Sequence, residues 1–375
     1  MSTANKISII KVASRNDKSE FISLSANIYK NSPNRVPPLN SLVRHELDFN
    51  KNPFWKHAVG ELFIAKINNK TVGRISAQID YNFINFHNTK IGYFGFFECV
   101  NDFTVASALF STAEKWLASR GMNKIQGPFS PSINADCGFM TKGFNEPHIF
   151  STAYSLPYYV TLAEKYGFKK IKQLFAFQKI VADGVPEIFQ KIAVRLKKNN
   201  SFTIKPINKY TLKNDVKIIV DIFNECWADN WGFSPITFDE LYSTISSLKF
   251  FEKKTCALIA FHNNKPAGVC VTIPDINQLL TGSNGKLNLK TIYRILFTRN
   301  KITRCRNVIL GVKKEFQNSG LPVLLFCESQ PFVEKNFKLI EFSWILDDNV
   351  KVINFIKRTG AVLHKKYCVI EKNIC

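Results

Sequence analysis

The chain has 375 residues, 45% of them apolar and 33 of them Phe, so it can bury a sizeable core, and its length favours two domains. Its net charge of +22 indicates an anionic partner such as a phosphorylated cofactor, a nucleic acid or an acidic membrane, although biased codon usage would give a similar composition. The apolar runs are short, a secretory signal is lacking, and the nine Cys are scattered without CxxC pairs. These features exclude a membrane-spanning or disulfide-rich class and indicate a cytosolic protein with reduced thiols.

The first half of the chain begins with a strand, a helix and a hairpin. An apolar strand at 7–12 precedes an amphipathic helix at 20–29. The stretch IAKINNKTVG at 64–73 then places Asn-Asn-Lys and a Gly between two β-like runs, which is typical of a tight hairpin. The elements expected after it are a strand at 91–100, a helix at 105–121, a strand at 124–129 and a helix that ends at Gly167.

The second half repeats this order. IAFHNNKPAG at 259–268 is identical to the first hairpin at six of ten positions and lies 195 residues further along. The glycines that end the last helices, Gly167 and Gly360, are 193 residues apart, nearly the same offset. The other elements of this copy are expected at 202–207, 216–227, 306–312, 321–336, 339–346 and 352–361. Several landmarks with one spacing predict a duplicated domain.

The sequence therefore predicts an α/β fold with two tandem domains, each a mixed, mostly antiparallel sheet flanked by helices. A stretch at 181–187 with Gly and Pro separates them, so the domains are expected at 1–183 and 184–375.

The second copy carries an extra segment at about 274–304. In it, Leu289, Ile292, Tyr293 and Leu296 form one apolar helical stripe. The basic residues that flank this stripe are Lys290, Arg294, Arg299 and Lys301. A basic amphipathic helix of this kind fits an interfacial, lipid-facing or lid role, and an ordinary surface helix that covers the core gives the same pattern.

The repeated unit resembles the GNAT superfamily of acyl-CoA-dependent N-acyltransferases. The resemblance is clearest in NVILGVKKEFQNSG at 307–320, where a β-like run leads into a QxxG turn and then an apolar helix. In the superfamily such a turn offers backbone N–H groups to the cofactor pyrophosphate. The matching residues here are Gln317, Asn318, Ser319 and Gly320, while Pro322 stands where Gly or Ala is usual. The first copy has no glycine turn, so acyl-CoA is expected in the second copy.

Longer phrases resemble a bacterial subgroup of tandem, YghO-like GNAT proteins. They lie at 127–144, 156–168, 224–235 and 341–349, and the resemblance covers nearly the whole chain. It implies acyl transfer to an amine. Enzymes of the bacterial ceramide synthase type belong to the same neighbourhood, which suggests a long acyl chain, a lipid amine and a cytoplasmic protein that works at the inner face of the membrane.

Thioester aminolysis needs a base for the amine, fixed donors for the oxyanion and a proton for the thiolate. Where many GNAT enzymes place an acidic Tyr in the last helix, this chain has Ile356 and Ala163, so that acid is absent. A thiolate with a pKa near 8.5 can leave without it. The candidate catalytic residues are Glu341, Ser343 on the same face of its strand, and Asp136 in a polar loop. Purely structural hydrogen bonding is the alternative for these carboxylates.

The remaining site candidates are backbone and pocket residues. Oxyanion donors are expected along Leu310, Gly311 and Val312, which need no particular side chain. An acceptor pocket is expected to include Asn134, Tyr158, Trp227, Asn230 and Trp231, for which core packing is the alternative. The isolated His262 and His364 are expected to be structural, and no metal site is expected.

Three functions fit these residues. The leading interpretation is an N-acyltransferase with an acyl-CoA or acyl-carrier-protein donor and a small-molecule or lipid amine acceptor, with an anionic membrane surface as a possible partner and no nucleic acid. A transferase that uses aminoacyl-tRNA, as tandem Fem-type ligases do, is one alternative and predicts salt-sensitive binding to RNA. A degenerate binding module without activity is the other. The sequence does not indicate the oligomeric state.

Overall fold

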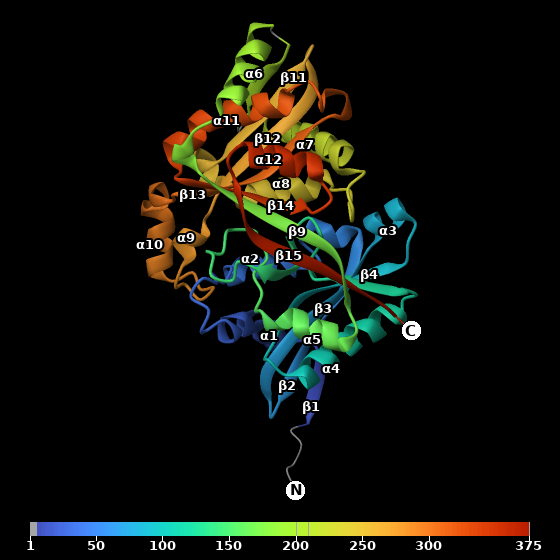
Figure 1. Ribbon diagram of the computed structural model, residues 1–375. Helices are drawn as coiled ribbons and strands as arrows, with labels where there is room; N and C mark the ends of the chain where they lie inside the picture. The colour runs from blue at the N-terminus through green and yellow to red at the C-terminus, as the bar shows by residue number, and fades with distance from the viewer. Residues whose placement is uncertain (1–5, 200, 209, 375) are drawn as a thin grey trace. The chain divides into compact units, whose positions relative to one another are not determined.

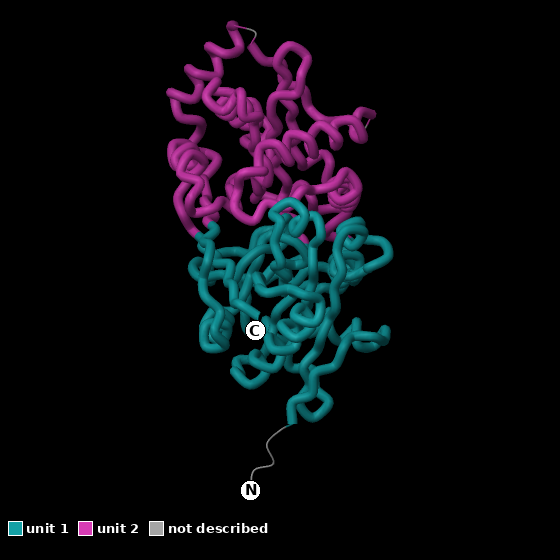
Figure 2. Tube along the Cα trace, turned by 90° about the vertical axis from the view of Figure 1, so that its right-hand side faces the viewer, with its two compact units in different colours: residues 1–174, 280–292, 365–375 teal, residues 175–279, 293–364 magenta. Residues whose placement is uncertain are grey.

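The computed structural model describes residues 6–199, 201–208 and 210–374. The chain divides into two compact units, shown in different colours in Figure 2. Unit 1 contains Met1–Leu174, Leu280–Ile292 and Lys365–Cys375, and unit 2 contains Phe175–Leu279 and Tyr293–His364. Each unit therefore includes segments from both halves of the chain. Among the described residues all eight Cys are free and six are buried, as the scattered spacing predicted.

Unit 1 is a mixed sheet with helices on both faces (Figure 1). Its strands run in the order β1 (Ile7–Lys11), β2 (Ala58–Ile67), β3 (Lys70–Asp80), β4 (Ile91–Cys99), β5 (Lys124–Gly127) and the second part of β15 (Val362–Asn373). Three short strands follow β5, namely β6 (Phe129–Ser130), β7 (Asp136–Cys137) and β8 (Phe139–Lys142). The helices are α1 (Arg15–Ile28), α2 (Asn40–Glu46), α3 (Tyr81–His87), α4 (Phe103–Ala118) and α5 (Tyr158–Tyr166), with a 3₁₀ turn η1 (Pro53–Lys56).

Strand alternation explains why both faces of this sheet are covered. Leu62 and Ile64 of β2 pack in a cluster with Phe21 of α1, whereas their neighbours Phe63 and Ala65 belong to the cluster around α4 and α5. The two faces of one strand thus supply two apolar cores, and the sheet is buried between α1 and α4.

Unit 2 repeats this plan. Its strands run in the order β10 (Thr203–Pro206), β11 (Cys256–His262), β12 (Lys265–Pro274), β13 (Arg304–Val312), β14 (Leu339–Leu346) and the second part of β9 (Lys169–Ile180). The helices of unit 2 are α6 (Glu187–Lys198), α7 (Leu212–Trp227), α8 (Phe238–Ser247), α11 (Leu321–Asn336) and α12 (Val350–Arg358). The segment 280–292 belongs to unit 1, so α9 (Asn277–Leu280) and α10 (Leu289–Phe297) each contain residues of both units. Four 3₁₀ turns are η2 (Val181–Asp183), η3 (Lys249–Lys254), η4 (Arg299–Lys301) and η5 (Lys314–Phe316).

The two predicted hairpins have the same geometry. Asn68 and Asn69 adopt φ of 49° and 63°, and Asn263 and Asn264 adopt 49° and 62°, the left-handed pair that a two-residue turn requires. In both hairpins the strand register also shifts by one residue just after the alanine, Ala65 or Ala260. The shared turn and bulge confirm that the chain contains one structural unit twice.

The last strand of each copy contributes to the other copy's sheet. In unit 1, Ile370–Asn373 of β15 pairs antiparallel with β5, and Lys366–Cys368 pairs with β8. In unit 2, the neighbour of β14 on the side away from β13 is β9, which comes from the first copy. The predicted order of elements is therefore confirmed, with strand exchange as an addition that spacing did not reveal.

Candidate functional site

Strands β13 and β14 of unit 2 separate part of the way along. Their parallel pairing runs from Arg304 and Leu339 to Asn307 and Phe342. β13 continues to Val312 and β14 to Leu346, but within the described residues no further pairs join them. Since the backbone groups at unpaired edges need other partners, this opening is a place where a ligand can bind as an added strand would.

The end of β13 directs backbone donors into this opening. Lys313 donates its N–H to the Ala267 carbonyl of β12 at 2.9 Å. N–H directions alternate along a strand, so those of Leu310 and Val312 point to the opposite edge, toward the opening. Gly311 leaves room for the Trp227 ring, because a Cβ at Gly311 would lie only 2.4 Å from that ring. The predicted oxyanion segment 310–312 therefore lies at an open edge beneath an aromatic side chain of α7.

The corresponding opening in unit 1 is filled. There β4 and β5 pair only from Ile91 and Lys124 to Tyr93 and Gln126. At the end of β4, the Tyr158 hydroxyl donates to the Cys99 carbonyl at 2.8 Å, and the Tyr159 hydroxyl accepts from the Cys99 N–H at 3.3 Å. Both tyrosines come from α5 and occupy the strand edge themselves. Tyr158, predicted as an acceptor-site residue, thus has a structural hydrogen bond in unit 1.

The QxxG turn lies between β13 and α11. Gln317 and Asn318 are exposed, and Gly320 has φ of 84°, a left-handed conformation that favours Gly. Ser319 Oγ accepts from the Leu321 N–H at 3.2 Å, and Pro322 fits the first helical turn. Among the described residues, none accepts from the N–H of Asn318 or Gly320. These two donors at a helix N-terminus suit a phosphate.

Gly320 is not open on every side. A Cβ at this position would lie 3.1 Å from Ile192 and 3.2 Å from Leu196, both on α6. The helix that precedes β10 therefore covers one side of the turn. The exposed Asn318, rather than Gly320, is the position where a side chain can be changed without disturbing packing.

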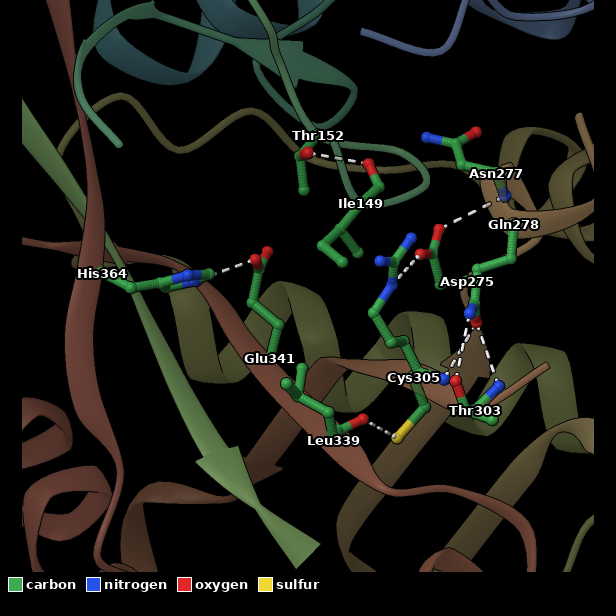
Figure 3. A network of polar contacts seen from close by, with 11 residues as sticks. Ile149, Thr152, Asp275, Asn277, Gln278, Thr303, Cys305, Leu339, Glu341 and His364 are labelled. Atoms are coloured by element: carbon green, nitrogen blue, oxygen red, sulfur yellow. Dashed lines mark hydrogen bonds and ion pairs between the residues drawn. The ribbon is translucent and has the colours of Figure 1, made fainter. Parts of the chain in front are cut away.

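Glu341 belongs to a buried polar network at the point where β13 and β14 separate (Figure 3). Its carboxylate is 0% exposed and lies 2.9 Å from His364 Nε2, where β15 begins. Ser343 Oγ donates to Glu341 Oε1 at 2.6 Å and accepts from Arg306 Nε at 2.9 Å. Arg306 is also the residue of β13 that pairs with Glu341 in the sheet. The structure thus brings together Glu341 and Ser343, as the strand periodicity predicted.

The network faces the side of the sheet that α7 covers. Phe342 lies against Phe326 of α11, so its strand neighbours Glu341 and Ser343 point to the other face. Trp227 and Gly311 meet on the α7 face as well. The opening between the strands therefore has a polar side with Glu341 and an apolar side with α11.

His364, which was expected to be structural, has a contact with Glu341 that the sequence did not indicate. It is 23 positions beyond Glu341 and comes from another strand, so neither spacing nor a motif joins the two. The repeat offered a partial signal. Glu341 pairs with Arg306 in unit 2, and at the corresponding place in unit 1 Gln126 pairs with Tyr93. The carboxylate is therefore present in one copy alone. A carboxylate that orients an imidazole is an arrangement that enzymes use for proton transfer.

The predicted acceptor residues of unit 2 lie around the end of α7. Trp227 stacks on Phe223 with ring centroids 4.7 Å apart, and the Asn230 N–H donates to the Trp227 carbonyl at 2.9 Å. Trp231 is half-buried. Two ion pairs, Lys313 with Glu225 at 3.0 Å and Lys314 with Asp229 at 2.6 Å, tie this end of α7 to the segment before the QxxG turn.

Asp136 lines a different pocket, in unit 1. The pocket has a volume of about 90 Å³ and is lined by charged residues of both signs: Arg35, Glu46, Arg74, Glu98 and Asp136. Burial, together with the negative charge of Asp136, raises the pKa of Glu46 to about 8. Asn134, two residues before Asp136, is exposed. The structure therefore does not place Asp136 in one unit with Glu341, and Glu46 is a second group that the sequence did not indicate.

We expect Glu46→Gln to stabilise the protein more at pH 9 than at pH 5. The pKa of Glu46 is raised from 4.5 to about 8 in the folded state, so between these values the unfolded chain ionises first and folding becomes less favourable as the pH rises. A neutral amide removes this dependence. Urea unfolding of both proteins across this range measures the difference. An equal effect of the substitution at both pH values would contradict the raised pKa.

No described helix has the length and apolar character that crossing a bilayer requires.

Comparison with known proteins supports the fold and adds relatives. No family model matches the chain. It is 33% identical over 370 residues to Protein YghO of Escherichia coli (strain K12), covering 96% of this chain and 94% of that protein. It is 30% identical over 382 residues to the bacterial ceramide synthase of Caulobacter vibrioides, covering 99% and 98% respectively. A tandem GNAT protein from the clavulanic acid biosynthesis pathway has a similar structure, with a TM-score of 0.60, 10% identity and 99% of each chain covered.

Proposed function

Because the chain belongs to the tandem GNAT family that includes YghO and the bacterial ceramide synthase, we propose that it transfers an acyl group from acyl-CoA to a lipid amine. The observation that carries the proposal is the opening between β13 and β14 in unit 2, with backbone donors at one edge and the Glu341–His364 pair where the strands separate. The filled opening of unit 1 supports the assignment of the donor to unit 2.

The proposed donor site uses the backbone of unit 2. The pyrophosphate of acyl-CoA binds the N–H groups of Asn318 and Gly320, with Gln317 and Ser319 in the same turn. The thioester lies along β13, where the Leu310 and Val312 N–H groups stabilise the oxyanion and Gly311 allows close approach. The acyl chain extends along the apolar α11 side of the opening.

The proposed chemistry begins with proton removal from the acceptor ammonium. His364 takes this proton, and Glu341 holds the imidazole in position and stabilises its charged form. The free amine attacks the thioester carbonyl carbon, the C–N bond forms and the C–S bond breaks. The nitrogen loses its second proton to the departing coenzyme A thiolate, and the proton on His364 returns to solvent. The coenzyme A thiolate leaves without a Tyr acid and takes up a proton at neutral pH, because its pKa is near 8.5. Ser343 acts as a positioning residue between Arg306 and Glu341.

The proposed acceptor approaches from the α7 face. Trp227 ends α7 and lies against Gly311, and Asn230 and Trp231 follow it in the chain. The two tryptophans suit an apolar amine. The name of the Caulobacter relative supports a lipid acceptor. A lipid amine places the reaction at a membrane surface, and the net charge of +22 suits both that surface and the cofactor phosphates. Asp136, Asn134 and Tyr158 of unit 1 have no part in this scheme.

The direct test is binding and turnover of a long-chain acyl-CoA. Titration calorimetry measures affinity, and release of the coenzyme A thiol on addition of a sphingoid amine measures transfer. Binding together with thiol release supports the proposal. Binding without release with any amine would indicate a binding module, and transfer from aminoacyl-tRNA alone would indicate the Fem-type alternative.

We expect Asn318→Asp to weaken acyl-CoA binding about tenfold or more. A carboxylate about 5 Å from a doubly charged pyrophosphate costs about 1.5–3 kcal/mol at an exposed site, and 1.4 kcal/mol corresponds to a factor of ten in Kd. Asn318 is exposed, so the fold should not change. The matched control is Asn318→Gln, which keeps the residue neutral and should bind normally. An unchanged Kd for Asn318→Asp would remove the QxxG turn from the donor site.

A further inference from the structure

The helix α10, within the segment that the first copy lacks, presents its apolar side to solvent. Leu289 is 86% exposed, Phe297 69% and Tyr293 58%, and Leu296 belongs to the same stripe. The helix is held by its opposite side, where Thr291 is 2% exposed. An ordinary surface helix buries its apolar stripe against the core, and α10 does the reverse. We call Leu287, Leu289, Tyr293, Leu296 and Phe297 the α10 surface.

All charged residues in the sequence that flanks the α10 surface are basic. No Asp or Glu occurs between Asp275 and Glu315, a stretch that includes the whole of α10 and its flanks. The basic residues nearest the surface in sequence are Lys286, Lys290, Arg294, Arg299 and Lys301. Lys286, Lys290 and Lys301 are exposed, and Arg299 lies over the ring of Phe250, itself 43% exposed, at 5.0 Å. The exposed apolar side chains of the α10 surface are therefore flanked in sequence by positive charge.

The dimensions of α10 fit a helix that lies on a membrane. Its nine residues extend about 13 Å at 1.5 Å per residue, far less than a bilayer thickness. Tyr293 and Phe297 pack with ring centroids 5.1 Å apart, so the aromatic side chains form one ordered contact. Apolar and aromatic residues at the boundary between headgroups and acyl chains, with Lys and Arg beside them, are typical of interfacial helices.

We propose that the α10 surface docks the protein on an anionic lipid bilayer. Leu289, Tyr293 and Phe297 enter the headgroup region, while the lysines contact lipid phosphates, each for about 1 kcal/mol near such a surface. A protein partner would have to match both an apolar stripe and the basic residues that flank it, whereas an anionic bilayer supplies both complements everywhere. The inference deepens the proposed function and rests on it in one respect: a lipid amine acceptor would be drawn from the same bilayer.

Vesicle co-sedimentation of the full chain tests the proposal. We expect binding to vesicles of phosphatidylcholine mixed with phosphatidylglycerol and much weaker binding to phosphatidylcholine alone. Leu289→Ser with Phe297→Ser should reduce the partition coefficient at least tenfold, because burying each side chain is worth about 1.5–3 kcal/mol. The double variant Lys286→Glu with Lys290→Glu should bind the mixed vesicles more weakly, while its binding to phosphatidylcholine vesicles should not change. The matched control, Ile188→Ser with Val194→Ser, removes two apolar residues of α6 that are 59% and 51% exposed, and it should bind as the unchanged protein does.

The outcomes separate docking from catalysis. Three results would overturn the docking proposal: no sedimentation with mixed vesicles, equal binding to both vesicle types, or an equal loss of vesicle binding in the α6 control. Turnover of a soluble short-chain acyl-CoA and amine, measured without vesicles, should be unchanged in both α10 variants, which shows that they are folded. Vesicle binding without any turnover would leave docking in place and overturn the proposed function instead.

Discussion

Replacing Glu341 by Gln should lower kcat for acyl transfer by about 10²–10⁴, the range that general acid–base catalysis contributes. The amide keeps the shape and the hydrogen bond from Ser343, but it cannot stabilise the imidazolium that forms when His364 takes the amine proton. Because the substitution leaves the donor site untouched, the Kd for acyl-CoA should not change. Steady-state thiol release and calorimetry measure the two quantities.

Two further variants show whether Glu341 acts through His364. His364→Asn should lower kcat to a similar extent, because Asn cannot take the amine proton. The control Glu371→Gln removes the carboxylate beside Gln126, the counterpart of Glu341 in unit 1, and should leave kcat unchanged. Unchanged kcat in both Glu341→Gln and His364→Asn would show that this network is structural.

Replacing Arg74 by Met should destabilise unit 1 by about 3–5 kcal/mol, as expected when one partner of a buried ion pair is removed. Arg74 Nη2 lies 3.0 Å from Glu98 Oε2, and both side chains are 7% exposed. Its Nη1 also donates to the Phe21 carbonyl at 2.6 Å, and the guanidinium lies over the Phe21 ring at 4.9 Å. Met fills similar space but leaves the Glu98 carboxylate buried without its cation.

Urea unfolding measures this effect, and an exposed ion pair provides its control. Lys170 and Glu164 lie 2.9 Å apart with both side chains 46% exposed, so Lys170→Met should change the unfolding free energy by less than about 1 kcal/mol. Adding Glu98→Gln to Arg74→Met should recover part of the loss, because the unpaired charge is then gone. Similar effects of Arg74→Met and Lys170→Met would contradict the importance of burial here.

The sequence was sufficient for the order of elements, because that order depends on local patterns that occur twice. The hairpin turns were identified from Asn-Asn-Lys-x-x-Gly, and both copies adopt the left-handed Asn pair. The exchange of β9 and β15 was not predictable in this way. A strand has the same alternation of apolar residues whether it pairs within its own copy or with the other copy. The role of α10 was also left open, because periodicity shows that a stripe exists but not which way it faces.

The candidate site was predictable only where it lies within one strand. Alternation along β14 correctly grouped Glu341 with Ser343. The His364 contact depends on a strand of distant sequence, and the Glu46 contact with the Asp136 pocket depends on the fold of α2. A single sequence carries no local pattern for such pairs. The aromatic filling of the unit 1 opening by Tyr158 and Tyr159 was likewise hidden, since two adjacent tyrosines on a helix are equally compatible with a pocket.

The exchange of strands has a consequence for biosynthesis. While the ribosome is still translating the second copy, β5 of unit 1 lacks the neighbour that Ile370–Asn373 will provide, so this sheet cannot be completed co-translationally. A nascent chain that has just emerged through residue 183 would expose an unprotected edge, and expressing that segment alone should give a product that aggregates or recruits chaperones. Gene duplication here has created two halves that mature only together.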